Sequence, residues 1–357
     1  MRLKDVTLRE AAQMPGRSYT ADQRVAAGRA LDRLGVEYVQ AGFPATGAPD
    51  PEVVRRLAAE ADATVTALAR PVEGDIDAAL EAGAGVVDLF APLSDRQLTH
   101  SLGKEREAVL GILESARDRV LEAGATPHVS VVDAFRTDHD HLGALFERFP
   151  DAPNVTLADT VGCRTPEEVR AFLDRLAVDR SRVGVHFHDD IGTATANALA
   201  AHAAGVGFAD VSVAALGERA GNPATEELVV AGTLSRDTAF GTNPRELVPA
   251  CRAVLDALGE TVPPGKAVLG EAVTTHESGI HTEAMLAEPS TFEPFDPARF
   301  GGERTLLFGE GTGRSGAAAL LAEAGVDADT AAFLALLREE GPLDREESVA
   351  LARREFG

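Results

Sequence analysis

The sequence predicts an α/β protein built as a (β/α)8 TIM barrel, followed by a C-terminal lid segment and a small α-rich subdomain. Three observations predict this fold class. Eight short apolar runs recur along the first two-thirds of the chain, amphipathic stretches of helical length separate them, and several of those stretches end in glycine just before the next run. An open doubly wound sheet is the alternative, because a sequence alone does not show whether a sheet closes.

The expected strands alternate with segments that carry helix signals. Thr20 to Gln23 resembles a capping box that opens the first long helix, and Pro166 begins another helix with acidic residues in its first turn. Apolar residues at helical spacing from Glu105 to Leu121 predict the longest helix. The strands are expected at Leu3–Thr7, Glu37–Ala41, Thr64–Leu68, Val86–Phe90, Pro127–Val132, Asn154–Ala158, Arg182–Phe187 and Asp210–Val213.

The strand–helix rhythm changes near Arg236. We therefore expect a catalytic barrel over residues 1–235 and a C-terminal part over residues 236–357, made of the lid segment and a small helical subdomain. No GxGxxG sequence follows the first strand, which argues against a dinucleotide-binding fold.

Composition excludes several function classes. The 357 residues carry a formal net charge of −23 and only three lysines, a balance that argues against nucleic acid as a partner. An acidic surface poor in lysine suggests a halophilic protein, and an ordinary acidic protein from a GC-rich genome is the alternative. Two cysteines allow no disulfide framework. Without an apolar run of about 18 residues or a signal peptide, we expect no membrane span and a cytoplasmic protein.

The most informative stretch is the end of the seventh strand, where His186 and His188 are spaced i, i+2. Alternate side chains of a strand point the same way, so both imidazoles should project together and can form half of a divalent metal site. Ordinary surface or core histidines are the alternative. Glu10 follows the first strand, and in a closed barrel it could complete a site of two histidines and one carboxylate.

Polar residues also follow other expected strands, at the same end of the barrel. Arg9 adjoins Glu10, and its planar fork suits a carboxylate or a developing enolate oxygen. Arg136 and Thr160 follow the fifth and sixth strands. Asn222 follows the eighth strand, where it is either a helix N-cap or a further metal contact. One metal and two arginines facing a cavity describe a receptor for a small 2-oxo acid.

Taken together, these segments resemble a known family. It is the homocitrate synthase and 2-isopropylmalate synthase group, acetyl-CoA-dependent aldol-type synthases that are metal-dependent (β/α)8 barrels related to the hydroxymethylglutaryl-CoA lyases. Six motifs occur in the family's order. They are Thr7-Leu8-Arg9-Glu10-Ala11-Ala12-Gln13, Ala41-Gly42-Phe43-Pro44, Asp159-Thr160-Val161-Gly162-Cys163, His186-Phe187-His188-Asp189-Asp190, Gly217-Glu218-Arg219-Ala220-Gly221-Asn222 and His276-Glu277-Ser278-Gly279-Ile280-His281.

The resemblance implies a role for each matching residue. It implies that acetyl-CoA and a 2-oxo acid are the substrates, that the metal is Mg²⁺, Mn²⁺ or Zn²⁺, and that a homodimer forms because the lid histidine serves the neighbouring subunit. The implied metal ligands are Glu10, His186, His188 and Asn222. The implied catalytic residues are Arg9, Glu218 and the lid histidine His281, and the implied substrate-binding residues are Arg9, Gln13, Arg136 and Thr160.

The chain also departs from the family pattern. Ala11-Ala12 replaces the usual Gly-Glu, Gln40 replaces a common glutamate, Gly184 stands where some homocitrate synthases place a glutamate, and Phe292 stands where a tyrosine is usual and cannot relay a proton. Homocitrate synthase, which acts on 2-oxoglutarate, is the favoured activity, and 2-isopropylmalate or citramalate synthase is the alternative.

Two further alternatives stay open. One is an acyl-CoA lyase, although neither Cys163 nor Cys251 lies in the glycine-rich loop that carries the lyase cysteine. The other is a degenerate barrel without activity, which would not bind metal.

Overall fold

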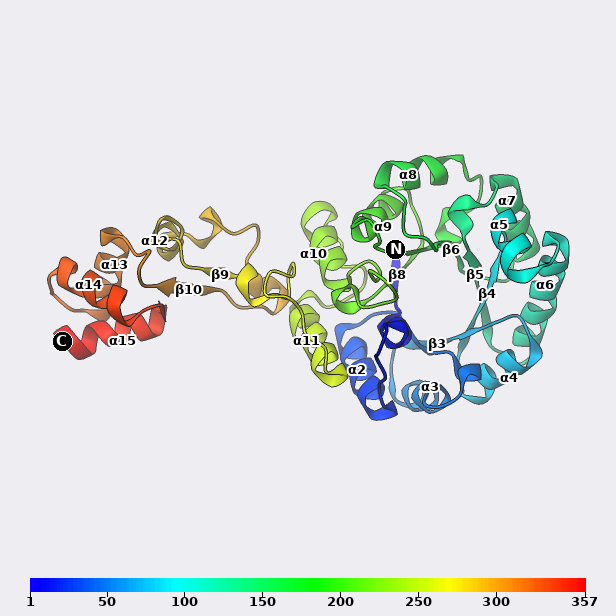
Figure 1. Cartoon of the computed structure of the whole chain (residues 1–357), viewed down its shortest axis with the longest axis horizontal. Helices are drawn as coiled ribbons and strands as arrows, with labels where there is room; N and C mark the ends of the chain where they lie inside the picture. Colours follow the sequence, from blue (N-terminus) through cyan, green and yellow to red (C-terminus); the bar gives the residue numbers. More distant parts are fainter. The chain divides into compact units, whose positions relative to one another are not determined.

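The computed structural model describes residues 1–357, and its first compact unit, Met1–Thr261, is the predicted barrel. All eight expected strands are present and parallel, and the first pairs with both the second and the eighth. The sheet is closed, so the open doubly wound alternative is wrong. In Figure 1 the helices surround the strands as a ring. The strands are β1 (Arg2–Asp5), β2 (Tyr38–Gly42), β3 (Thr64–Ala69), β4 (Val86–Pro92), β5 (Thr126–Val132), β6 (Val155–Asp159), β7 (Val183–Phe187) and β8 (Phe208–Val211).

The helices begin where the local signals predict. Thr20 and Gln23 form the expected capping box, and Thr165 forms a second one with Glu168 around the predicted proline start. The helix expected from Glu105 is the longest, with 17 residues. The helices of the first unit are α1 (Thr7–Glu10), α2 (Ala21–Leu34), α3 (Asp50–Glu60), α4 (Glu73–Glu81), α5 (Asp95–Gln97), α6 (Arg106–Glu122), α7 (His139–Arg148), α8 (Pro166–Arg175), α9 (Ala194–Ala203), α10 (Thr225–Arg236) and α11 (Leu247–Leu258).

The two faces of the barrel sheet differ in chemistry. Odd-numbered positions such as Leu3, Val87 and Val185 are fully buried apolar residues, as expected beneath the surrounding helices. Even-numbered positions are mainly polar, and Lys4 pairs in register with Asp210 across the β1–β8 seam. The interior of this barrel is therefore a polar core that leads up to the strand ends.

The first strand is shorter than expected. It ends at Asp5 rather than Thr7, and Thr7–Glu10 forms the short helix α1. The reason is a local hydrogen bond, because the backbone N–H of Thr7 donates to Oδ1 of Asp5 at 2.9 Å and starts a helical turn. The sequence suggested that Arg9 and Glu10 follow directly on the strand. Instead, a helical turn holds both residues.

The second compact unit, Val262–Gly357, has its own apolar core around Phe308, Leu320 and Phe333. The units divide at 261/262 and not at the expected 235/236, since α11 packs against α2 of the barrel. None of the helices in either unit has the length and apolar character needed to cross a membrane. The second unit contains β9 (Thr275–His276), β10 (Thr305–Phe308), β11 (Leu343–Asp344), α12 (Gly279–Ala287), α13 (Arg314–Ala324), α14 (Thr330–Glu340) and α15 (Arg345–Phe356).

Candidate active site

Three potential metal ligands meet at the C-terminal ends of the barrel strands. Ligand atoms of Glu10, His186 and His188 all lie within 4.8 Å of one another. Nε2 of His186 is 3.5 Å from Oε1 of Glu10 and 3.4 Å from Nε2 of His188. All three side chains are buried. Two imidazole nitrogens and a carboxylate oxygen around one point form a donor set that suits a divalent cation.

Local structure explains why these side chains converge. His186 lies on β7 and His188 just beyond its end, so their i, i+2 spacing turns both rings to the same side. Glu10 comes from the last residue of α1. Oγ1 of Thr7, at the start of that helix, accepts a hydrogen bond of 2.9 Å from the backbone N–H of Val213 beyond β8. This bond ties α1 to the neighbouring strand end and holds Glu10 beside β7.

Asp210 orients the first histidine. Its Oδ2 lies 3.0 Å from Nδ1 of His186, and both groups are buried. A carboxylate at this distance fixes the ring with Nδ1–H donating, which leaves the lone pair of Nε2 directed at Glu10 and His188. A carboxylate behind a ligating histidine is the usual support for a metal site.

The surroundings of Glu10 and His188 favour the protonation states that bind metals. Burial is the largest influence on Glu10 and raises its pKa, but the charges of Arg9, His186 and His188 together lower it to about 2. Burial, followed by the neighbouring His186, lowers the pKa of His188 to about 4. At neutral pH the carboxyl is therefore ionised and the imidazole of His188 is neutral, as metal coordination requires.

Asn222 is a buried amide at the same place and not a helix cap. The following helix α10 begins at Thr225 with Ala224 in the N-cap position, so the N-cap alternative is wrong. Its Nδ2 donates to the carbonyl of Phe187 at 3.0 Å and lies 3.4 Å from Nε2 of His186. Its Oδ1 is buried without a hydrogen-bond partner. An orphaned buried oxygen beside a His–His–Glu cluster fits a fourth ligand.

Arg9 borders this cluster on the other side. One guanidinium nitrogen, Nη1, is 2.6 Å from Oε1 of Glu10, while Nε donates to Oε1 of Gln40 at 2.6 Å. The side chain is only 11% exposed. Two fixed contacts leave the rest of the fork available to an anion beside the metal ligands.

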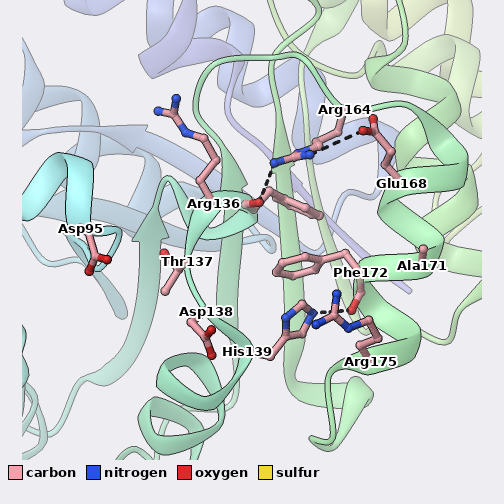
Figure 2. Close-up of a pocket in the computed structure, with 11 residues that line it drawn as sticks. Asp95, Arg136, Thr137, Asp138, His139, Arg164, Glu168, Ala171, Phe172 and Arg175 are labelled. Atoms are coloured by element: carbon pink, nitrogen blue, oxygen red, sulfur yellow. Dashed lines mark hydrogen bonds and ion pairs between the residues drawn. The ribbon is translucent and has the colours of Figure 1, made fainter.

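Arg136 and Thr160 lie at the strand ends of β5 and β6, outside the ligand triangle. Nε of Arg136 pairs with Oδ1 of Asp133 at 2.6 Å, and Oγ1 of Thr160 accepts a hydrogen bond of 2.8 Å from the N–H of Asp133. Arg136 also lines a cavity of about 590 Å³ between these strand ends and α7 and α8. Figure 2 shows Arg164 in that cavity, bonded to Glu168 and to a backbone carbonyl. The predicted contacts of Arg136 and Thr160 with an oxo acid stay a prediction.

The remaining predicted site residues, Glu218, Gln13 and His281, do not lie together in one place. The backbone N–H of Glu218 donates to Oε2 of Glu10 at 3.4 Å, while its carboxylate lies 3.6 Å from Arg219. Gln13 is exposed after α1. His281 lies on α12 of the second unit, where its ring stacks on Phe292 with centroids 4.0 Å apart. The roles of these residues also stay predictions.

Sequence reasoning missed the charged groups beneath the ligands. Lys4 is buried inside the barrel, where it contacts two buried carboxylates, Asp88 and Asp210. A signal was present for the two aspartates, because each is the charged residue of an otherwise apolar strand, and such residues are seldom fully buried unless paired.

A closed (β/α)8 barrel with two histidines, a glutamate and an orphaned amide at its C-terminal mouth defines the class of metal-dependent barrel enzymes. The comparisons with known proteins identify the family. The model of the HMGL-like family matches residues 1–254, and that of the homocitrate synthase post-HMGL domain-like family matches residues 268–339.

Relatives extend over most of the chain. The homocitrate synthase AksA of Methanopyrus kandleri is 39% identical, with 90% of this chain and 82% of the relative covered. A protein of Ignicoccus hospitalis, provisionally named 2-isopropylmalate synthase, is 36% identical, with coverage of 95% and 86%. Hydroxymethylglutaryl-CoA lyase from Pseudomonas aeruginosa shares the barrel fold with a TM-score of 0.66 at 23% identity, over 76% of this chain and 96% of the lyase.

The chain therefore belongs to the HMGL-like family, and within it to the group named for homocitrate and isopropylmalate synthases. It is an enzyme of the acyltransferase class that these synthases represent.

Proposed function

We propose that this protein condenses acetyl-CoA with a 2-oxo acid to give a 2-hydroxy acid of the alkylmalate type, as a metal-dependent homodimer. The observation that carries the proposal is the Glu10–His186–His188 triangle with Arg9 2.6 Å from its carboxylate. The triangle suits a divalent metal, and the arginine places a positive charge where the carboxylate of the acid and the oxygen of an enolate would lie. The names of its relatives support the same reaction class.

The reaction needs a proton acceptor and a charge-stabilising site. A base removes a methyl proton from acetyl-CoA, and the carbanion carbon bonds to the carbonyl carbon of the oxo acid, whose oxygen then takes up a proton. Water hydrolyses the thioester and releases the CoA thiol. A bound Mg²⁺, Mn²⁺ or Zn²⁺ would supply Lewis acidity toward the carbonyl. Arg9 orients the carboxylate, and we assign proton transfer to His281 and Glu218.

The inner wall opposite the ligands bears on the choice of oxo acid. Asp88 faces the barrel interior, where it contacts Lys4. Phe90 and Pro92 lie two and four residues further along β4, so their side chains face the same way. Pro92 pairs in register with Val132, so that side chain lies on the same face. Phe90, Pro92 and Val132 are half-buried. An apolar wall favours a 2-oxo acid with a small apolar side chain, such as pyruvate or 2-oxoisovalerate.

A second candidate substrate is 2-oxoglutarate, which the sequence motifs favour. Its distal carboxylate would need a cation, and Arg136 at the end of β5 is the candidate. However, Arg136 is already paired with Asp133 at 2.6 Å, and Arg219 is paired with Asp190 at 2.8 Å. A distal carboxylate would therefore share a guanidinium group with a carboxylate that is already paired to it, whereas a small apolar acid needs no such group, so we rank the apolar acids first.

The test is a thiol-release assay with a panel of oxo acids. Acetyl-CoA is offered with pyruvate, 2-oxoisovalerate, 2-oxoglutarate or oxaloacetate, with Mg²⁺ or Mn²⁺. High and low salt are both used because the net charge of −23 suggests a halophilic protein. We expect turnover with an apolar acid, and loss of metal and of turnover in His188→Ala. His100→Ala, which removes an exposed histidine outside the triangle, is the control. No free thiol with any acid would contradict the proposal.

A further inference from the structure

A lysine lies at the centre of the barrel, beneath the metal ligands. Lys4 on β1 is 0% exposed, and its Nζ is 2.5 Å from Oδ2 of Asp88 and 3.2 Å from Oδ1 of Asp210. Fully buried lysines are rare, because an ammonium group loses its hydration unless carboxylates replace it. Here two carboxylates do so, and they come from β4 and β8, on different sides of the barrel.

Each carboxylate also contacts a second side chain, and these two side chains belong to different parts of the active site. Asp210 uses its other oxygen, Oδ2, to hold Nδ1 of His186 at 3.0 Å. Asp88 accepts a hydrogen bond of 3.1 Å from Nε2 of Gln40, whose Oε1 in turn accepts from Nε of Arg9 at 2.6 Å.

The two arms meet again at Glu10, which contacts Arg9 at 2.6 Å and His186 at 3.5 Å. The contacts therefore form a closed ring of seven side chains. In order, the ring is Lys4, Asp210, His186, Glu10, Arg9, Gln40 and Asp88.

The net charge of the ring suits a place beside a divalent cation. Two cations, Lys4 and Arg9, face three carboxylates in the ring, so the charges of these five groups sum to −1. A divalent cation changes the sum to +1, and the carboxylate of an oxo acid brings it to zero. Without the lysine the two carboxylates that it bridges would repel each other, and each would lose one of the contacts that fix its position.

We propose that Lys4 is a positioning residue. It fixes Asp210 and Asp88 at once, and so aligns the metal ligand His186 with the substrate-binding Arg9. The proposal rests on the proposed metal site but not on the choice of oxo acid. It predicts that removing Lys4 weakens metal binding even though a positive charge leaves the neighbourhood of the metal.

The experiment measures the dissociation constant of Mn²⁺ by calorimetric titration of the full-length protein, without substrate. We expect Lys4→Met to weaken Mn²⁺ binding roughly 10- to 100-fold, the usual effect of losing support behind a metal ligand. Asp210→Asn should weaken it similarly. The double variant should be no weaker than Asp210→Asn alone, because both changes break the same arm. Lys104→Met, which removes an exposed lysine, is the control.

A failure to fold, a failure of the role of Lys4 and a failure of the proposed function give different results. If Lys4→Met does not fold, Lys4→Met/Asp88→Leu replaces the ion pair with apolar groups, and it should fold and still bind Mn²⁺ weakly. Unchanged or tighter Mn²⁺ binding in a folded Lys4 variant would overturn the proposal, since the lysine would then only neutralise charge. Failure of the wild-type protein to bind any divalent metal would instead contradict the proposed function.

Discussion

At the residue scale, a buried carboxyl between β1 and the surrounding helices has an unusual titration. Asp5 at the end of β1 is fully buried, and burial raises its pKa from 3.8 to about 6, although hydrogen bonds from Thr7 and Thr225 oppose the rise. A carboxyl with a raised folded-state pKa binds its proton more tightly in the folded state than in the unfolded state. Its contribution to stability is therefore present at low pH and is lost as the pH rises from about 4 through about 6.

Asp5→Asn should remove this pH dependence. The amide keeps the acceptor for the N–H of Thr7 and can donate to Oγ1 of Thr225, so its contacts survive. The free energy of unfolding of the variant should match that of the wild type near pH 4 and exceed it at pH 7.5 by at most ~3 kcal/mol. Urea unfolding at both pH values measures the difference. Asp62→Asn at an exposed position is the control, and a wild-type advantage at pH 7.5 would contradict the assignment.

At the scale of elements, the loop after β8 builds one side of the proposed metal site. Gly221 has φ +87°, and a Cβ atom there would lie 1.6 Å from the carbonyl oxygen of Ala215. Its own carbonyl accepts a hydrogen bond of 2.9 Å from the N–H of Asp189, next to His188. The loop therefore fits only around a glycine, and a side chain must displace Asn222.

Gly221→Ala should consequently lose both stability and metal affinity. Gly192→Ala is the matched control, because Gly192 has φ +74° and a Cβ atom there would meet no other atom within 4 Å, so only the backbone strain of roughly 1–2 kcal/mol applies. We expect Gly221→Ala to exceed that cost and to bind Mn²⁺ at least ~10-fold more weakly, in line with the loss of a group that supports a metal ligand. Urea unfolding and calorimetric titration check the two effects, and equal behaviour of the two variants would rule out the loop's role.

Elements were predictable where their signals are local. The capping box at Thr20, the proline start at Pro166 and the eight short apolar runs predicted the strands and several helix starts of the barrel, and the spacing of His186 and His188 predicted their common direction. Long-range packing was not predictable. The helical turn that carries Glu10 depends on a hydrogen bond to Val213, and the burial of Asn222 depends on the backbone of Phe187. Lys4 was overlooked because its partners, Asp88 and Asp210, lie far away in the sequence.

At the scale of the whole molecule, the chain has two units with separate cores, and the lid histidine lies in the second. His281 stacks on Phe292, which holds the ring but offers no hydroxyl group. The three proposed metal ligands all come from the first unit. If the resemblance to the synthases extends to their assembly, the His281 of one subunit serves the barrel of the other.

Mixing two inactive variants tests this arrangement. His281→Ala keeps an intact metal site, and His188→Ala keeps an intact lid. After subunit exchange at equal amounts, half of the dimers should be mixed, and one of the two sites in each mixed dimer should be complete. The mixture should therefore recover about one quarter of the wild-type activity, whereas each variant alone stays inactive. Thiol release measures the activity, and mass spectrometry of isotope-labelled subunits confirms the exchange. Complete exchange without any recovery would show that His281 acts within its own subunit or not at all.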